Sequence, residues 1–122
     1  MALIIDLDAA EARDPGQVGG KGAALTALAR QGFLVPPTLC LTTTAYDVFV
    51  DAALLRPVIR QELGRKDFAD MRWEEIWDTA LRIRNRFLRA PIPDQIRAEV
   101  GERLSGAFAT DALAVRSSAL GE

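Results

Sequence analysis

The stretch 19–22, with the sequence Gly-Gly-Lys-Gly, constrains the fold and function of this chain more than any other stretch. Glycines permit positive φ angles and the close approach of a ligand, and the spacing of the leucines that follow predicts a helix over 23–30. The start of a helix is electropositive, so Lys21 is favoured there when an anion accompanies it. The stretch therefore indicates a phosphate-binding turn. A plain turn with a solvated lysine explains the same residues equally well.

Scarce residue types exclude several classes of site. The 122 residues contain no histidine and a single cysteine, Cys40. Histidine metal ligands, nucleophiles paired with histidine, a phosphohistidine, a zinc cluster and an internal disulfide are therefore excluded from this segment. The glycine spacing fits neither a P-loop, which needs Ser or Thr after the lysine, nor the dinucleotide-binding pattern.

Composition indicates one globular domain. Hydrophobic residues make up 49% of the chain, enough for a core, and the net charge of −2 does not suggest a nucleic-acid-binding protein. No apolar run has the length of a membrane span, and the first residues lack the pattern of a secretory leader. We expect a cytoplasmic location, with neither nucleic acid nor a membrane as a partner.

The pattern of apolar residues and helix breakers predicts a mixed α/β (α+β) fold with a short sheet and several helices. Strands are expected at 2–5, 38–42 and 112–115, so that one lies near each end of the chain. Helices are expected at 23–30, 44–53, 58–63, 70–90 and 93–104. Gly32 is expected to end the first helix, and Thr44 with Asp47 resembles a capping box at the start of the second.

The longest expected helix, 70–90, has an apolar stripe that includes Trp73 and Trp77, and we expect both rings to be buried. Its acidic residues come early and its basic residues late, an order that the helix dipole favours. A phosphate or nucleic-acid patch and a ring-stacking platform are the functional alternatives. The basic residues concerned are Arg82, Arg84, Arg86 and Arg89.

A second cluster of hydrogen-bond donors follows the last expected strand. Arg116 offers a planar fork that matches two phosphate oxygens, and Ser117 and Ser118 add hydroxyl groups. This cluster and the glycine-lysine turn could hold one polyphosphate if the two ends of the chain meet in the fold. Alternatively, Arg116 pairs with Asp6 or Glu122 and the serines form a turn.

Four ordered motifs occur together over most of the chain. They are Val18, Gly19, Gly20 and Lys21; Val35, Pro36 and Pro37; Thr42, Thr43, Ala45 and Tyr46; and Val115, Arg116, Ser117, Ser118 and Ala119. In order and spacing they resemble the N-terminal ATP-binding region of phosphoenolpyruvate synthase and pyruvate phosphate dikinase, which rifamycin phosphotransferases share. The resemblance extends from about Val18 to Glu122.

The resemblance implies an ATP-grasp fold whose first nucleotide-binding subdomain is 1–122, truncated at its C-terminal end. Lys21 and Arg116 would contact the phosphates of ATP and act as the catalytic cations. The wider cofactor-binding set would be Gly19, Gly20, Lys21, Gly22, Arg116, Ser117 and Ser118. No metal ligand is expected within the chain, and Mg²⁺ would be held by residues beyond it.

The same resemblance implies a phosphotransferase of which this chain is an inactive part. The parent enzyme would pass phosphate from ATP through a phosphohistidine, on a separate domain, to pyruvate. The partners would be that domain and the remaining ATP-grasp subdomain. Two alternatives stay open: part of a rifamycin phosphotransferase, and a standalone binding module without catalysis.

Overall fold

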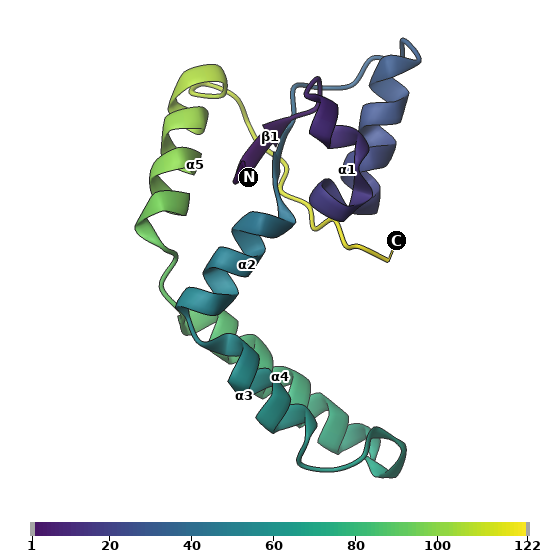
Figure 1. Cartoon of the computed structure of the whole chain (residues 1–122), viewed down its shortest axis with the longest axis vertical. Helices are drawn as coiled ribbons and strands as arrows, with labels where there is room; N and C mark the ends of the chain where they lie inside the picture. Colours follow the sequence, from purple (N-terminus) through teal and green to yellow (C-terminus); the bar gives the residue numbers. More distant parts are fainter. Residues whose placement is uncertain (1, 122) are drawn as a thin grey trace. The chain divides into compact units, whose positions relative to one another are not determined.

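The computed structural model describes residues 2–121, which form two compact units. The sheet unit comprises 2–47 and 94–121, and the helical unit comprises 48–93. Figure 1 labels most of the elements. Along the chain they are β1 (Ile4–Asp6), the 3-10 helix η1 (Ala10–Arg13), α1 (Pro15–Arg30), β2 (Leu39–Leu41), α2 (Thr43–Ala52), α3 (Leu55–Leu63), the 3-10 helix η2 (Phe68–Asp70), α4 (Trp73–Arg89) and α5 (Asp94–Ala107).

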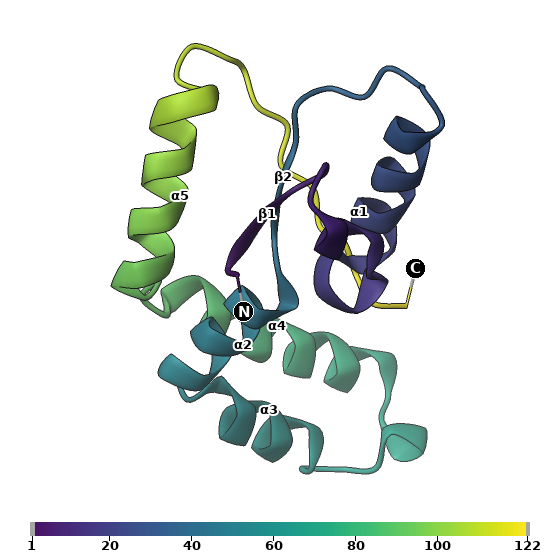
Figure 2. The ribbon, with the colours of Figure 1, turned by 45° about the horizontal axis from the view of Figure 1, so that its top comes forward.

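The sheet has two antiparallel strands, with Ile5 of β1 opposite Cys40 of β2 (Figure 2). The third strand expected at 112–115 is wrong, because this segment has no regular structure and Val115 is 95% exposed. Strand propensity alone does not make a strand, and here the segment pairs with neither β1 nor β2 but continues to α1. The described chain is therefore mostly helical with a two-stranded sheet, rather than a three-stranded α/β fold.

One cluster of the core of the sheet unit lies between β1, η1 and the start of α1. Ile5, Ala12 and Val18 are buried there, and Ala23 and Cys40 pack against them. Burial raises the pKa of the Cys40 thiol above its usual value, because the thiolate loses solvation. Cys40 therefore acts as a small apolar side chain that joins β2 to α1.

Helix α1 begins at Pro15, well before the expected start at residue 23. Asp14 caps it, since its Oδ1 accepts a hydrogen bond from the Gly16 amide at 2.8 Å. Proline at the first helical position has no amide to leave unsatisfied, so Asp-Pro is a start signal that the sequence contained. At the other end, Gly32 adopts a φ of +88°, and its predicted role in ending the helix is confirmed.

Helix α2 follows β2 directly, and a threonine joins the two. Thr42 Oγ1 donates to the Ala2 carbonyl at 2.8 Å and accepts from the Ala45 amide at 3.3 Å. The observed start, Thr43, lies one residue before the predicted Thr44. One hydroxyl thus caps the helix and fixes it to the segment that precedes β1.

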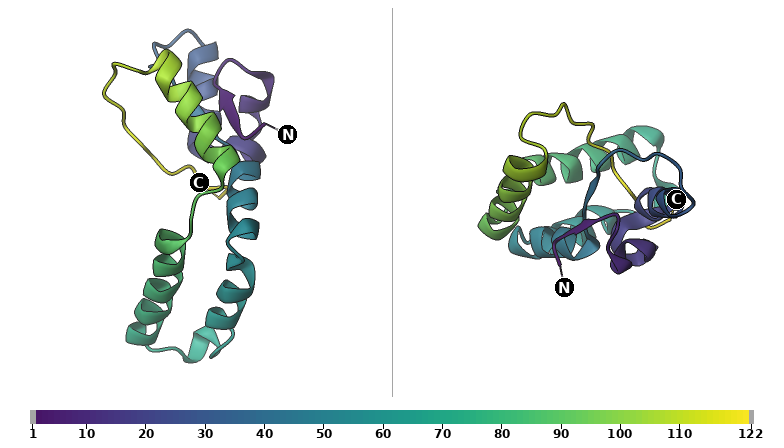
Figure 3. Two further views of the ribbon diagram at one scale, coloured as in Figure 1. Left: turned by 90° about the vertical axis from the view of Figure 1, so that its left-hand side faces the viewer. Right: turned by 90° about the horizontal axis from the view of Figure 1, so that it is seen from above.

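In the helical unit, α3 and α4 lie side by side (Figure 3). Glu62 of α3 pairs with Arg82 of α4 at 2.7 Å and with Arg65 at 2.9 Å. The rings of Phe49 and Phe87 lie 5.9 Å apart at a tilt of 49°, which adds an aromatic contact at one end of the helix pair.

The prediction that Trp73 and Trp77 are buried is wrong: 68% and 72% of their surfaces are exposed. Only part of the apolar side of α4 is covered: Thr79 is buried and Ile76 and Ile83 beside it are half-buried, while the two tryptophans lie toward the exposed part. Periodicity shows that such a helix is amphipathic but does not show which apolar side is covered.

Among residues 2–121, no helix is long and apolar enough to cross a membrane.

Truncation of the small sheet core should be costly. We expect Ile5→Ala to lower the free energy of unfolding by about 2–5 kcal/mol, because it removes buried methylene groups and leaves a cavity. The matched control is Leu34→Ala, since Leu34 is fully exposed and its truncation should change stability by less than about 0.5 kcal/mol. Urea denaturation followed by circular dichroism measures both, and equal effects would contradict this description of the core.

The Glu62 pair should make stability depend on pH. The hydrogen bond from Arg82, with the charge of Arg65, holds the pKa of the Glu62 carboxyl below its ordinary value of 4.5. A lowered folded pKa stabilises the protein above the unfolded pKa, and that contribution is lost as the pH falls through the folded one. Glu62→Gln should therefore lower the melting temperature at pH 7, and the difference from wild type should shrink at pH 3. Glu99→Gln, at an exposed position of α5, is the control.

Candidate phosphate-binding site

The glycine-lysine turn lies inside α1, where Gly19 interrupts the helix. Its φ of 74° and ψ of 175° are not helical, so α1 consists of two helical segments joined by a kink. This backbone region is essentially restricted to glycine, because a Cβ atom would be strained there. Lys21 lies in the first turn of the segment that follows the kink, and it is exposed.

The hydroxyl of Ser118 forms hydrogen bonds to the backbone on both sides of the kink. It donates a hydrogen bond to the Val18 carbonyl at 2.7 Å and accepts one from the Gly22 amide at 3.1 Å. Val18 and Gly22 are four residues apart, the spacing that a continuous α-helix joins directly. A side chain from the far end of the chain therefore supplies both backbone groups with the partners that the helix would otherwise give them.

A second contact joins the same two stretches, since the Gly20 amide donates to the Ala119 carbonyl at 2.9 Å. The structure thus brings together the two clusters that the sequence analysis singled out, although about 100 positions separate them. In Figure 1 the last segment of the chain, in yellow, can be followed to α1.

Close packing explains two of the glycines. A Cβ atom at Gly19 would lie 2.3 Å from Ser118 Oγ and 2.4 Å from the Ser118 carbonyl oxygen. At Gly22 it would lie 2.9 Å from Val18 Cβ and 3.4 Å from Cys40 Sγ. Both positions therefore need glycine to let the Ser118 segment and β2 approach the kink, whether or not a ligand is bound.

The remaining predicted site residues differ in what they contact. Arg116 is exposed and makes no hydrogen bond or ion pair to any residue of 2–121. Its alternative partner Asp6 pairs with Arg103 instead, and Glu122 lies outside the described residues. Ser117 is exposed like Arg116. The sequence analysis named Ala119 as part of a motif but not as a site residue; it contributes a backbone carbonyl, which its side chain does not reveal.

A threonine follows the proline pair. Thr38 Oγ1 donates to the Pro36 carbonyl at 2.8 Å. A hydroxyl bonded two residues back stabilises the turn locally. The threonine thereby provides a contact that glycine, which has no side chain, could not make.

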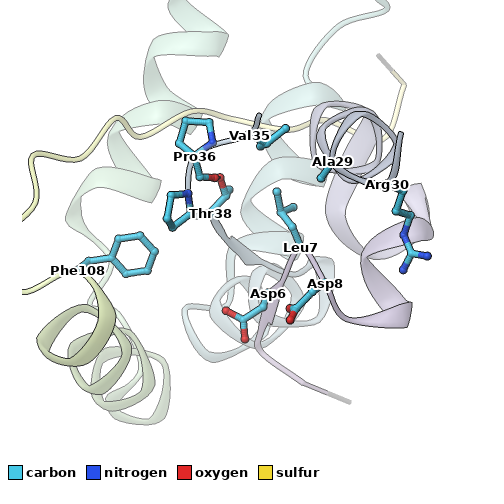
Figure 4. A pocket seen from close by; sticks show the side chains of 10 residues that line it. Asp6, Leu7, Asp8, Ala29, Arg30, Val35, Pro36, Thr38 and Phe108 are labelled. Atoms are coloured by element: carbon cyan, nitrogen blue, oxygen red, sulfur yellow. The ribbon is translucent and has the colours of Figure 1, made fainter. Parts of the chain in front are cut away.

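An open pocket of about 490 Å³ lies elsewhere in the sheet unit, beside the C-terminal turn of α1 (Figure 4). Its lining is mostly apolar, with Val35, Pro36 and Phe108 on one side and the carboxylates of Asp6 and Asp8 on the other. The charges at this pocket are of both signs, because Arg30 also lines it and Asp6 pairs with Arg103. Neither Lys21 nor Arg116 is among its lining residues, so the pocket is separate from the predicted phosphate site.

Clustered metal ligands are absent from the described part of the chain. Within 2–121 no group of three or more histidine, cysteine or carboxylate side chains is placed to hold a metal ion. No chemical step at this turn is therefore assigned to a metal held by these residues.

Comparison of the sequence with known families identifies the class of protein to which the chain belongs. The family of the pyruvate phosphate dikinase AMP/ATP-binding domain matches residues 15–122, almost the whole chain. The match includes both the glycine-lysine turn and Arg116. The chain belongs to this family.

Individual relatives are enzymes of greater length. A rifampicin phosphotransferase from a Streptomyces species is 36% identical over 98% of this chain, and one from Bacillus subtilis is 30% identical over 99%. A probable phosphoenolpyruvate synthase from Methanocaldococcus jannaschii is 32% identical over the full chain. The chain spans only 14%, 14% and 10% of these relatives, respectively.

The kink should tolerate no side chain. We expect Gly19→Ala to lower the free energy of unfolding by about 1–3 kcal/mol, because the backbone region is strained and the Cβ would displace Ser118. Gly101→Ala is the matched control in α5, where a Cβ meets nothing within 4 Å and should add about 0.5–1 kcal/mol of stability. Hydrogen exchange of the Gly20 and Gly22 amides should accelerate only in the Gly19 variant; unchanged exchange would refute the displacement.

Proposed function

We propose that this chain binds the phosphates of ATP between Lys21 and Arg116, as the first ATP-grasp subdomain of a phosphotransferase. The observation that carries the proposal is the joining of the two predicted clusters through Ser118, which places both cation-bearing stretches at one kink. Membership of a family described as an AMP/ATP-binding domain supports the choice of nucleotide.

In this proposal the two cations perform different parts of one task. The Lys21 ammonium is a point charge at the start of a helical segment, where the backbone already attracts anions. The Arg116 guanidinium donates two parallel hydrogen bonds to two oxygens of one phosphate. Phosphoryl transfer depends mainly on positioning and charge neutralisation, so these contacts would lower the barrier without either residue forming a covalent bond.

The acceptor that we propose is a rifampicin-type antibiotic, since rifampicin phosphotransferases match nearly the whole chain at up to 36% identity. Pyruvate is the second candidate, supported by the 32% identity to a probable phosphoenolpyruvate synthase. Catalysis would require a phosphohistidine domain and a second ATP-grasp subdomain, because the described residues hold neither a histidine nor a metal cluster.

Charge removal at the kink should weaken nucleotide binding. We expect Lys21→Gln and Arg116→Gln each to raise the Kd for ATP about tenfold, the loss of one charge-assisted hydrogen bond. The matched controls are Lys66→Gln, which removes an exposed pair with Glu75, and Arg97→Gln on α5. Isothermal titration calorimetry of the chain with ATP measures the Kd of all four variants. If the site variants bound ATP as tightly as the controls, the proposal would be wrong.

The acceptor needs a separate assay with the longer enzyme that contains this chain. That enzyme is incubated with ATP and with either rifampicin or pyruvate, and the phosphorylated product is identified by mass spectrometry. Phosphorylated rifampicin is the expected result. Phosphoenolpyruvate as the only product would move the assignment to the second candidate.

A further inference from the structure

The hydroxyl of Ser118 has no proton left for a phosphate. A serine hydroxyl has one donor, and here that donor is directed at the Val18 carbonyl at 2.7 Å. At neutral pH an ionised phosphate oxygen can only accept a hydrogen bond from a hydroxyl group, and it therefore needs the hydroxyl proton. Ser118 therefore does not act as a phosphate ligand in this arrangement, although it follows Arg116 so closely in the sequence.

The amides of the turn are used in the same way. The Gly20 amide is bonded to the Ala119 carbonyl at 2.9 Å and the Gly22 amide to Ser118 Oγ at 3.1 Å. Each backbone amide is a single donor. Two of the glycines that the sequence analysis placed in the phosphate site thus serve to attach the last segment of the chain to α1.

The geometry of the bridge has a direct consequence for the cations. Lys21 immediately precedes Gly22, whose amide donates a hydrogen bond to Ser118 Oγ. Arg116 lies two residues before Ser118. Two residues span at most about 7 Å even when fully extended. The Ser118 hydroxyl therefore limits how far the Arg116 backbone can move from the turn that carries Lys21.

We propose that Ser118 is a positioning residue for the phosphate site, an inference that rests on the proposed function. Its hydroxyl ties the Arg116 segment to the Lys21 turn, so that both cations reach one phosphate chain. A backbone segment that is already held beside the turn loses less conformational freedom when its arginine binds a phosphate. Without the hydroxyl, Gly22 and Val18 lose their shared partner, and the hydrogen bond from the Gly20 amide to the Ala119 carbonyl is left to hold the Arg116 segment near Lys21.

The test is a double-mutant cycle on ATP binding by the chain, measured by calorimetry. Ser118→Ala should raise the Kd for ATP about tenfold, as far as Arg116→Gln does. The variant with both changes should bind no more than about twofold more weakly than either alone, because Arg116 is already misplaced in the first. If the double variant raised the Kd for ATP about a hundredfold, or if Ser118→Ala bound ATP as tightly as wild type, the proposal would be overturned.

Ser105→Ala is the matched control, because Ser105 Oγ also donates to a backbone carbonyl, at 2.7 Å, but on exposed α5. Its Kd for ATP should equal that of wild type. A weakening as large as that of Ser118→Ala would mean that the cycle reports general destabilisation, and the proposal would fall.

A measurement on the unaltered protein covers the case in which Ser118→Ala does not fold. In the ATP complex, nuclear magnetic resonance couplings between ³¹P and protein protons should involve the Lys21 and Arg116 side chains. A coupling to the Ser118 hydroxyl or the Gly22 amide would overturn the positioning role and leave ATP binding standing. Absence of any ATP binding by wild type would overturn the proposed function, and this inference with it.

Discussion

The sheet unit depends on one hydroxyl group that bonds to both sides of a broken helix. A helix with a glycine in the φ 74° conformation leaves backbone donors and acceptors without their usual partners, and burying such groups unsatisfied is unfavourable. Ser118 supplies both missing partners at the kink. The position of the last segment, the need for glycine at 19, and the location of the candidate site all follow from this one arrangement.

The sequence was most informative where local chemistry decides the structure. Helix breakers and apolar periodicity placed the long helix near its observed range, Trp73–Arg89, and Gly32 ended α1 as predicted. The two clusters around Lys21 and Arg116 were identified from residue types alone. Each of these features depends on neighbouring residues in the chain, which is the information that a single sequence carries best.

The failures all concern contacts between distant parts of the chain. The run at 112–115 has strand-forming residues but pairs with neither strand of the sheet, and Trp73 and Trp77 are apolar but lie on an uncovered face of α4. For the candidate site, the sequence indicated two clusters but not the contacts that each residue makes. The fold shows that the Ser118 hydroxyl and two glycine amides bond within the chain, while Arg116 is exposed.

Ser118 meets Gly22 across 96 positions and Val18 across 100. Closing so long a loop is entropically unfavourable, and contacts of this kind form slowly compared with local helices and hairpins. In a chain synthesised from its N-terminus, β1, β2 and the two arms of α1 emerge long before Ser118 does. The hydrogen bonds of Ser118 are therefore among the last contacts of the sheet unit to form. Until they do, the Val18 carbonyl and the Gly22 amide lack the partner that the finished fold gives them, so the kink in α1 is completed only after residue 118 has joined it.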